Sequence, residues 1–223
     1  MRPNTPHAVV TLEHSVTLGS HYFAMSTMQD TWAGLLHTFV LEKLITNTAH
    51  NAFLHVIRQM IIFVHNGLTK DTIEEEDKAR AHLPHLQDMQ SVTDLLTLCN
   101  LGILQHVFDF DTYTHATNSP TDVMTPKQKD ELWKYDFNAV PPLHRRAAMH
   151  ARALALDIIG WFNATYELRG KVNGENITVR PISIAAQFLG VQCSGLLYYK
   201  NVALEKGHEG VANCTLEMLR RQI

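Results

Sequence analysis

The sequence predicts a mainly α fold, in which a short N-terminal β-hairpin is followed by a bundle of about six helices. Residues 7–24 are dense in Val, Thr, Tyr and Phe, which favour strands. From about residue 26 onward the apolar residues recur every three or four positions, which is the spacing of one helical face. This change of period divides the chain into residues 1–25 and a helical domain, residues 26–223.

The hairpin is expected to consist of two strands, residues 7–12 and 16–24. Glu13, His14 and Ser15 provide a short connection between them. Because a two-stranded hairpin is marginally stable in water, these strands are expected to pair with further strands or to pack on the helices.

The first helices of the bundle follow from caps and apolar stripes. Ser26 or Thr27 can cap a helix that runs to about Ile45. The next helix, residues 52–65, is apolar nearly all round, which predicts a central position, and Asn66-Gly67 is expected to end it.

A third helix is expected to begin at Ser91, because Ser91 and Asp94 resemble a capping box. The stretch after Asp109 is rich in turn formers and predicts a loop. The remaining elements are expected in this order: a short helix from Thr125-Pro126 to about Tyr135, a long helix at 143–168 with an alanine-rich stripe, a Gly/Asn turn with the extended piece NITVR at 169–181, and helices at 183–199 and about 209–221.

Composition excludes several classes of function. The formal net charge of −3 predicts no general attraction to nucleic acid. The best basic cluster lies on the predicted helix at 143–168 and is interpreted as a solvated face; it consists of His144, Arg145, Arg146, His150 and Arg152. Polar residues interrupt the longest apolar runs, 52–65 and 184–199, so neither is expected to span a membrane.

Few residues suggest catalysis by themselves. The three cysteines, Cys99, Cys193 and Cys214, form no CxxC pair and are expected to be reduced and inert. The acidic run at 74–77 is interpreted as a solvated segment. Asp109, Asp111 and Glu131 have no spacing that would pair them as acid and base, so no catalytic residue is assigned.

Fourteen histidines invite a metal hypothesis. A His-x-x-x-His pair would place two imidazoles on one helical face, but the chain contains none. Most histidines are therefore interpreted as surface or packing residues. His7 differs, because it opens the first predicted strand directly after a turn.

The residues from His7 to Phe23 follow the pattern H-A-V-x-T-x-x-x-S-V-x-x-G-S-x-x-F. This segment resembles the distal end of a JmjC domain, a cupin-like double-stranded β-helix, and is most similar to the branch associated with PHD fingers. The resemblance implies that residues 1–25 are the remnant of such a barrel and that His7 is the third iron ligand. Members of the family use iron(II) and 2-oxoglutarate, and many demethylate histone lysines. The resemblance therefore also implies a histone substrate and a nuclear location; without it, a cytoplasmic location is expected.

The other iron ligands of that family form a His-x-Asp or His-x-Glu motif. No histidine in this chain has an acidic residue two positions later, and only six residues precede His7. The chain alone is therefore expected to bind neither iron nor 2-oxoglutarate and to be inactive as an oxygenase. Three explanations stay open: the chain is the C-terminal portion of a longer JmjC-like protein, a degenerate relative, or an unrelated protein. The alternative function is a non-catalytic helical protein-interaction domain.

Overall fold

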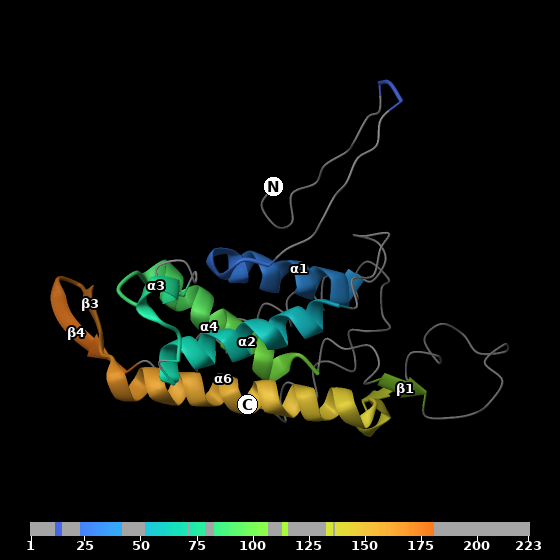
Figure 1. The fold of residues 1–223 in the computed structure, drawn as a ribbon. Helices are drawn as coiled ribbons and strands as arrows, with labels where there is room; N and C mark the ends of the chain where they lie inside the picture. The colour runs from blue at the N-terminus through green and yellow to red at the C-terminus, as the bar shows by residue number, and fades with distance from the viewer. Residues whose placement is uncertain are drawn as a thin grey trace.

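The computed structural model describes residues 12–14, 23–41, 52–70, 72–78, 83–106, 113–115, 133–135 and 137–180. This part of the chain is mainly helical, as predicted (Figure 1). Its elements are η1 (Met25–Thr27), α1 (Met28–Leu41), α2 (Phe53–Thr69), α3 (Glu75–Lys78), α4 (Met89–Leu104), β1 (Tyr113–His115), β2 (Trp133–Tyr135), η5 (Phe137–Ala139), α6 (Pro142–Thr165), β3 (Leu168–Val172) and β4 (Glu175–Val179).

The described residues support the mainly helical class but not the predicted number of helices. Four helices in the described part of the chain are longer than one or two turns, namely α1, α2, α4 and α6, and the count of about six is not supported there. The predicted strands at 7–12 and 16–24 lie almost wholly outside the described residues, as do the predicted helices at 183–199 and 209–221. Residues 12–14, which include Glu13 and His14 of the predicted connection, form an exposed bend.

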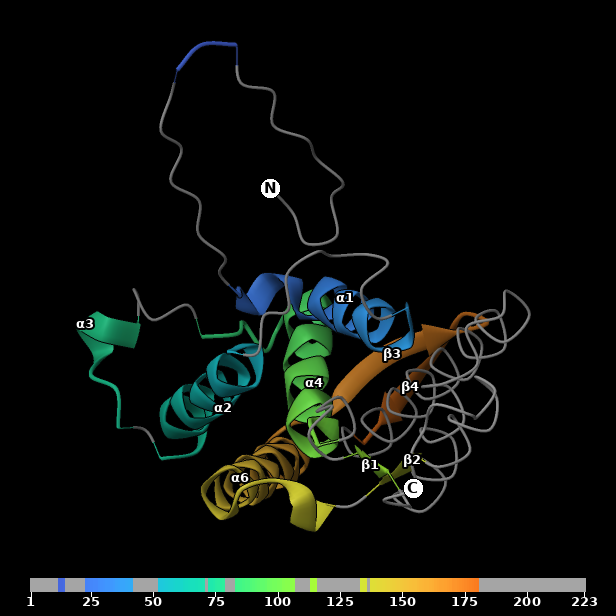
Figure 2. The same ribbon diagram turned by 90° about the vertical axis from the view of Figure 1, so that its right-hand side faces the viewer.

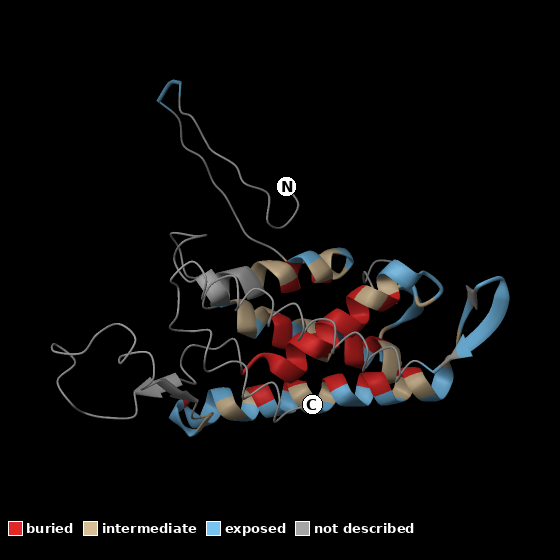
Figure 3. Cartoon of the chain, turned by 180° about the vertical axis from the view of Figure 1, so that it is seen from behind, coloured by how far each residue is buried: buried red, intermediate tan, exposed pale blue. Residues whose placement is uncertain are grey.

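Helix α4 is the centre of the domain. It crosses between α1 at one end and α6 at the other, with α2 alongside (Figures 1 and 2). Val92 and every residue from Asp94 to Leu104 are buried, and Figure 3 shows burial concentrated on this helix. The expectation that the helix at 52–65 is central was therefore wrong. An apolar composition does not decide which helix the others surround, and Phe63 of α2 is 42% exposed.

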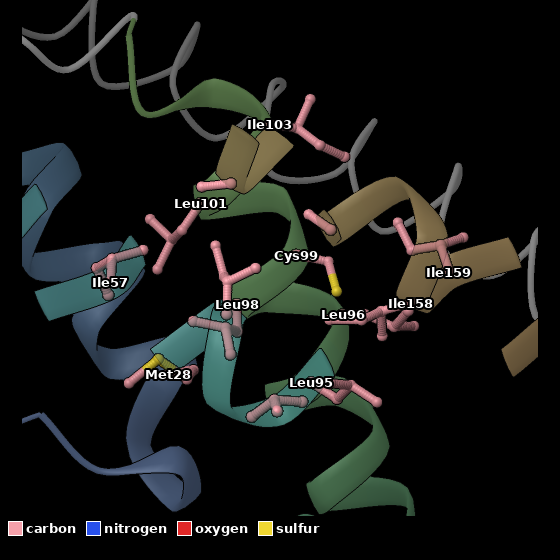
Figure 4. Packing of buried hydrophobic residues seen from close by; sticks show 14 of the residues in the cluster. Met28, Ile57, Leu95, Leu96, Leu98, Cys99, Leu101, Ile103, Ile158 and Ile159 are labelled. Carbon is pink, nitrogen blue, oxygen red and sulfur yellow. The ribbon is translucent and has the colours of Figure 1, made fainter. Parts of the chain in front are cut away.

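Close packing around α4 depends on small residues. A Cβ atom at Gly102 would overlap Ile61 Cδ1 of α2 and lie 3.2 Å from Ala155 Cβ of α6. Ala148, Ala151 and Ala155 are all buried, which confirms that the alanine stripe of α6 lets a neighbouring helix approach closely. Figure 4 shows the core beside this contact, where large apolar side chains of α4 meet those of α2 and α6.

The starts of α4 and α1 are stabilised by carboxylates in a way that the sequence did not predict. Asp88, and not Ser91, is the N-cap of α4; its side chain accepts hydrogen bonds from the backbone N–H groups of Gln90 and Ser91. Asp94 is buried in α4, and its Oδ1 accepts a hydrogen bond from the backbone N–H of Gln29, 3.2 Å away in the first turn of α1. A side chain of α4 therefore accepts a hydrogen bond from a backbone N–H group at the start of α1, where Ser26 or Thr27 was expected to be the cap.

Helix α2 continues past its predicted end at Asn66-Gly67 and runs to Thr69. Gly67 has a packing role instead, because a Cβ there would lie 2.8 Å from Leu83 Cδ2 and 2.9 Å from Ile73 Cδ1. The connection between α2 and α4 thus folds back onto the last turns of α2.

Two short antiparallel strand pairs flank α6. β1 pairs with β2, and His115 lies opposite Trp133. Both elements correct the sequence analysis, because β1 lies in a predicted loop and β2 at the end of the helix predicted to reach Tyr135. Each strand has only three residues, and their pairing joins segments far apart in the chain, so neither produces a recognisable local pattern.

The second strand pair, the hairpin β3–β4, follows α6 directly. Asn173 and Gly174 form its turn with φ values of 51° and 85°, the left-handed conformation that a two-residue hairpin turn requires. The predicted turn and the extended piece NITVR are confirmed, but α6 ends at Thr165 and not at residue 168. Tyr166 is already extended, and its ring contacts those of Trp161 and Phe162, with centroids 5.7 and 5.2 Å apart.

Candidate functional site

The predicted metal ligand His7 lies outside the described residues, so its surroundings stay a prediction. Cys193, Cys214, Asp109, Asp111 and Glu131 lie outside them too. Within the described ranges, no three His, Cys, Asp or Glu side chains come together as a metal site. His14 is exposed in the bend at 12–14.

Cys99 is the cysteine that the structure describes, and it is a free, buried thiol. Burial raises the pKa of the Cys99 thiol to about 12, because the interior disfavours the thiolate. Its sulfur lies among apolar side chains, close to Ile158 and Ile159 of α6 (Figure 4). A thiol with this pKa is inert as a nucleophile near neutral pH, in agreement with the prediction.

A buried polar bridge joins α2, α4 and α6 at one end of their contact. Arg58 of α2 donates through Nε to Gln105 Oε1, 2.6 Å away. Gln105 Nε2 in turn donates to the backbone carbonyl oxygens of Gly102 and Ala148, at 3.0 and 3.3 Å. Both polar atoms of the Gln105 amide are thus used, and its bonds to Arg58 and Ala148 join α4 to α2 and α6, which suits a structural bridge.

A second polar bridge lies two turns further along α2. His65 is buried, and its Nε2 lies 2.7 Å from Asp157 Oδ2 of α6. Since a carboxylate accepts, this distance assigns a hydrogen to Nε2. The Nδ1 atom is buried and has no hydrogen-bond partner among the described residues, whereas the side chain of Asp157 is 60% exposed.

The His65–Asp157 pair resembles a catalytic triad without its nucleophile, in which His65 would be the base and Asp157 would orient it. Such an arrangement needs a hydroxyl or thiol at the second imidazole nitrogen, and Nδ1 of His65 has none. The hydroxyl of Thr69, one turn away, donates to the backbone carbonyl of His65. The pair therefore acts as a clamp between α2 and α6, together with the bridge at Arg58. No feature of the sequence could pair two residues 92 positions apart.

The outer face of α6 is the other candidate site. Arg146 and His150 of the predicted basic cluster are exposed there, and Arg145 donates from Nη1 to Asn138 Oδ1 at 2.6 Å. His144 is exposed in the first turn of α6, on the side of the helix that carries the buried alanines. These positions agree with the predicted solvated face.

The same face also carries apolar residues that the sequence analysis did not single out. Met149 is 53% and Leu156 51% exposed, and Ala153 and Gly160 are exposed between and after them. These four residues, the outer stripe of α6, are spaced by four, three and four positions. That spacing places them on one face, opposite the buried alanines. It was a detectable signal, hidden by the stronger alanine stripe.

No described helix is both long enough and apolar enough to cross a membrane. No protein-family model matches the chain, and neither a curated protein nor a solved structure was found to match it. The relationship to JmjC proteins therefore stays a prediction from the sequence.

Proposed function

We propose that the helical domain is a non-catalytic protein-interaction domain and that the outer stripe of α6 is its contact surface. The observation that carries this proposal is the exposure of Met149 and Leu156, two large apolar side chains seven residues apart on the face of α6 opposite its buried alanines. Single exposed apolar residues are common, but a row of them along a helix is typical of an interaction surface.

The arrangement of the described polar residues supports the same proposal. Arg58, Gln105 and His65 are buried between helices, and their hydrogen bonds hold the domain together. Cys99 is held as a neutral thiol. The chemistry-bearing side chains are thus used in the scaffold, whereas α6 presents its apolar row to the surroundings.

The proposal can be tested with a photo-crosslinking amino acid. Benzoylphenylalanine replaces Leu156 in one variant and Arg169, an exposed residue of β3, in a matched control. After irradiation in the native cells, we expect discrete protein adducts with the variant at position 156 and few with the control. Equal adduct formation at the two positions, or none at either, would contradict a contact surface on α6.

We also propose, from the pattern between His7 and Phe23, that the chain is the C-terminal portion of a JmjC-like iron(II)/2-oxoglutarate oxygenase with a histone substrate. His7 would then be one iron ligand of a site completed by a His-x-Asp or His-x-Glu motif elsewhere in the protein. The helical domain would be the interaction module attached to that barrel.

Iron titration tests this second proposal. The chain of 223 residues is expected to bind no stoichiometric iron(II), and His7→Ala should leave that result unchanged. Tight iron binding with 2-oxoglutarate turnover by this chain alone would contradict the proposal. An in-frame upstream segment with a His-x-Asp motif, whose fusion to the chain gives iron binding that His7→Ala removes, would support it.

A further inference from the structure

We propose that the partner of the outer stripe is α6 of a second copy of this chain, packed antiparallel across a two-fold axis. This inference rests on the proposed function of the stripe and names its occupant. The argument comes from the order of side-chain sizes along α6, from the position of Gly160, and from the charges at the two ends of the helix.

The order of large and small residues makes the stripe complementary to itself. Met149 and Gly160 are equidistant from the centre of the stripe, and so are Ala153 and Leu156. An antiparallel pair of α6 helices centred there places Met149 of each copy opposite Gly160 of the other. It also places each Leu156 opposite Ala153 of the other copy. Every large side chain thus meets a small residue, which is how helices interdigitate at close range.

Gly160 has no reason to be glycine in the single chain. A Cβ added there would meet no atom of the described residues within 4 Å, in contrast to Gly102, where it would overlap α2. Glycine inside an exposed helix lowers helix stability relative to alanine. Its φ lies in the ordinary helical region, so the backbone does not require it either. A groove for the Met149 side chain of a second copy gives this glycine a role.

Charge also favours the antiparallel orientation over the parallel one. The first turns of α6 carry Arg145 and Arg146, and the chain from Pro142 to Leu156 contains no acidic residue. Glu167 is exposed just beyond the other end of α6. Antiparallel pairing brings the arginines of one copy to the C-terminal end of the other helix, where the helix dipole is negative. Parallel pairing would place the arginines of both copies together.

The edge of the stripe is consistent with this orientation. His150 and Asp157 lie along one edge, and antiparallel pairing sets that edge beside the same edge of the second copy. The Asp157 carboxylate uses Oδ2 for His65 and is 60% exposed, so it remains accessible from outside. In Figure 1 the β3–β4 hairpin rises on the side of α6 that faces α4, away from the outer stripe.

The test exchanges the sizes of the paired residues in the full chain. Light scattering after gel filtration should give twice the chain mass of 25.3 kDa for the wild type, with dissociation on dilution over about a hundredfold range. Gly160→Met places two large side chains opposite each other and should raise the dimer dissociation constant roughly 10- to 100-fold. The double variant Gly160→Met/Met149→Ala restores one large and one small residue and should recover most of the affinity.

Circular dichroism of Gly160→Met distinguishes loss of pairing from loss of folding. Because a side chain at position 160 points into open space in the single chain, the helix content of this variant should equal that of the wild type. A wild type with the mass of one chain at every concentration would overturn the inference, and so would a dimer insensitive to Gly160→Met or a double variant that stays monomeric.

The crosslinker at position 156 separates the two proposals. An adduct of twice the chain mass supports both, an adduct with a different protein supports only the interaction surface, and no adduct contradicts both.

Discussion

Helices α4 and α6 both carry many apolar residues, but α4 is buried on nearly all sides whereas α6 keeps one face exposed. In α4 nearly every side chain is buried, including the polar residues Thr97 and Asn100, because α1, α2 and α6 surround it. In α6 the buried side chains form one face, and Met149 and Leu156 stand on the opposite face. The difference shows that a helix at the edge of a bundle keeps one face that the fold does not need. Substitutions on that face can therefore change binding without changing stability.

Two leucines give the largest expected contrast between these helices. Leu98 of α4 is fully buried, so Leu98→Ala should lower the free energy of unfolding by about 2–5 kcal/mol. Leu156 of α6 is half exposed, and Leu156→Ala should change it by less than about 0.5 kcal/mol. Urea denaturation of both variants at a concentration where the wild type is monomeric measures the two values. Equal losses would mean that the outer stripe belongs to the core.

Two glycines sharpen the comparison and should give effects of opposite sign. Gly102→Ala adds a Cβ that overlaps Ile61, so it should destabilise the domain by about 1–3 kcal/mol. Gly160→Ala meets open space and should stabilise the monomer by about 0.5–1 kcal/mol through helix propensity. Thermal unfolding monitored by circular dichroism decides both. A stabilising Gly102→Ala would show that α2 and α6 move away from α4 easily enough to accommodate the added Cβ.

The clamp between α2 and α6 should have a smaller effect, because Asp157 is partly solvated. Asp157→Ala removes the acceptor of the buried His65 Nε2–H and should cost about 1–2 kcal/mol in the free energy of unfolding. Asp157→Asn keeps an oxygen acceptor and serves as the matched control, with a smaller loss expected. The two variants can be compared by urea denaturation near neutral pH. If both lose equally, the charge of the carboxylate and not the hydrogen bond is what matters.

The smallest expected effect concerns the start of α4. The backbone N–H of Ser91, then its hydroxyl, and the N–H of Gln90 hold the pKa of Asp88 below its ordinary value of 3.8. The contribution of this carboxylate to stability is therefore complete above pH 3.8 and is lost as the pH falls through the lowered value. Curves of the free energy of unfolding against pH for the wild type and Asp88→Asn should run parallel above pH 3.8 and converge below it. Curves that stay parallel throughout would show that the Asp88 charge contributes nothing.

The sequence predicted those elements whose signals are local. The alanine stripe of α6 repeats at helical spacing, and Asn173-Gly174 favours a tight turn, so the helix and the turn were found. The mainly α class followed from the same periodicity.

The features that were missed depend on partners far away in the chain. The cap that Asp94 gives to Gln29 joins residues 65 positions apart, and the clamp between His65 and Asp157 spans 92. An apolar surface indicates burial but does not identify the neighbouring helices, which is why α2, apolar nearly all round, was expected at the centre in place of α4. The outer stripe of α6 was visible in the sequence, but it could be separated from the core stripe only after the burial of each face was known.

The turn at Asn173-Gly174 offers a practical use of the fold. It lies at the tip of a hairpin that extends beyond the end of α6, and its residues are exposed (Figures 1 and 3). Backbone at such a tip tolerates extra residues well, since few contacts depend on it. A fluorescent domain inserted there would label the chain without touching either face of α6, so self-association could be followed by energy transfer between labelled copies in living cells.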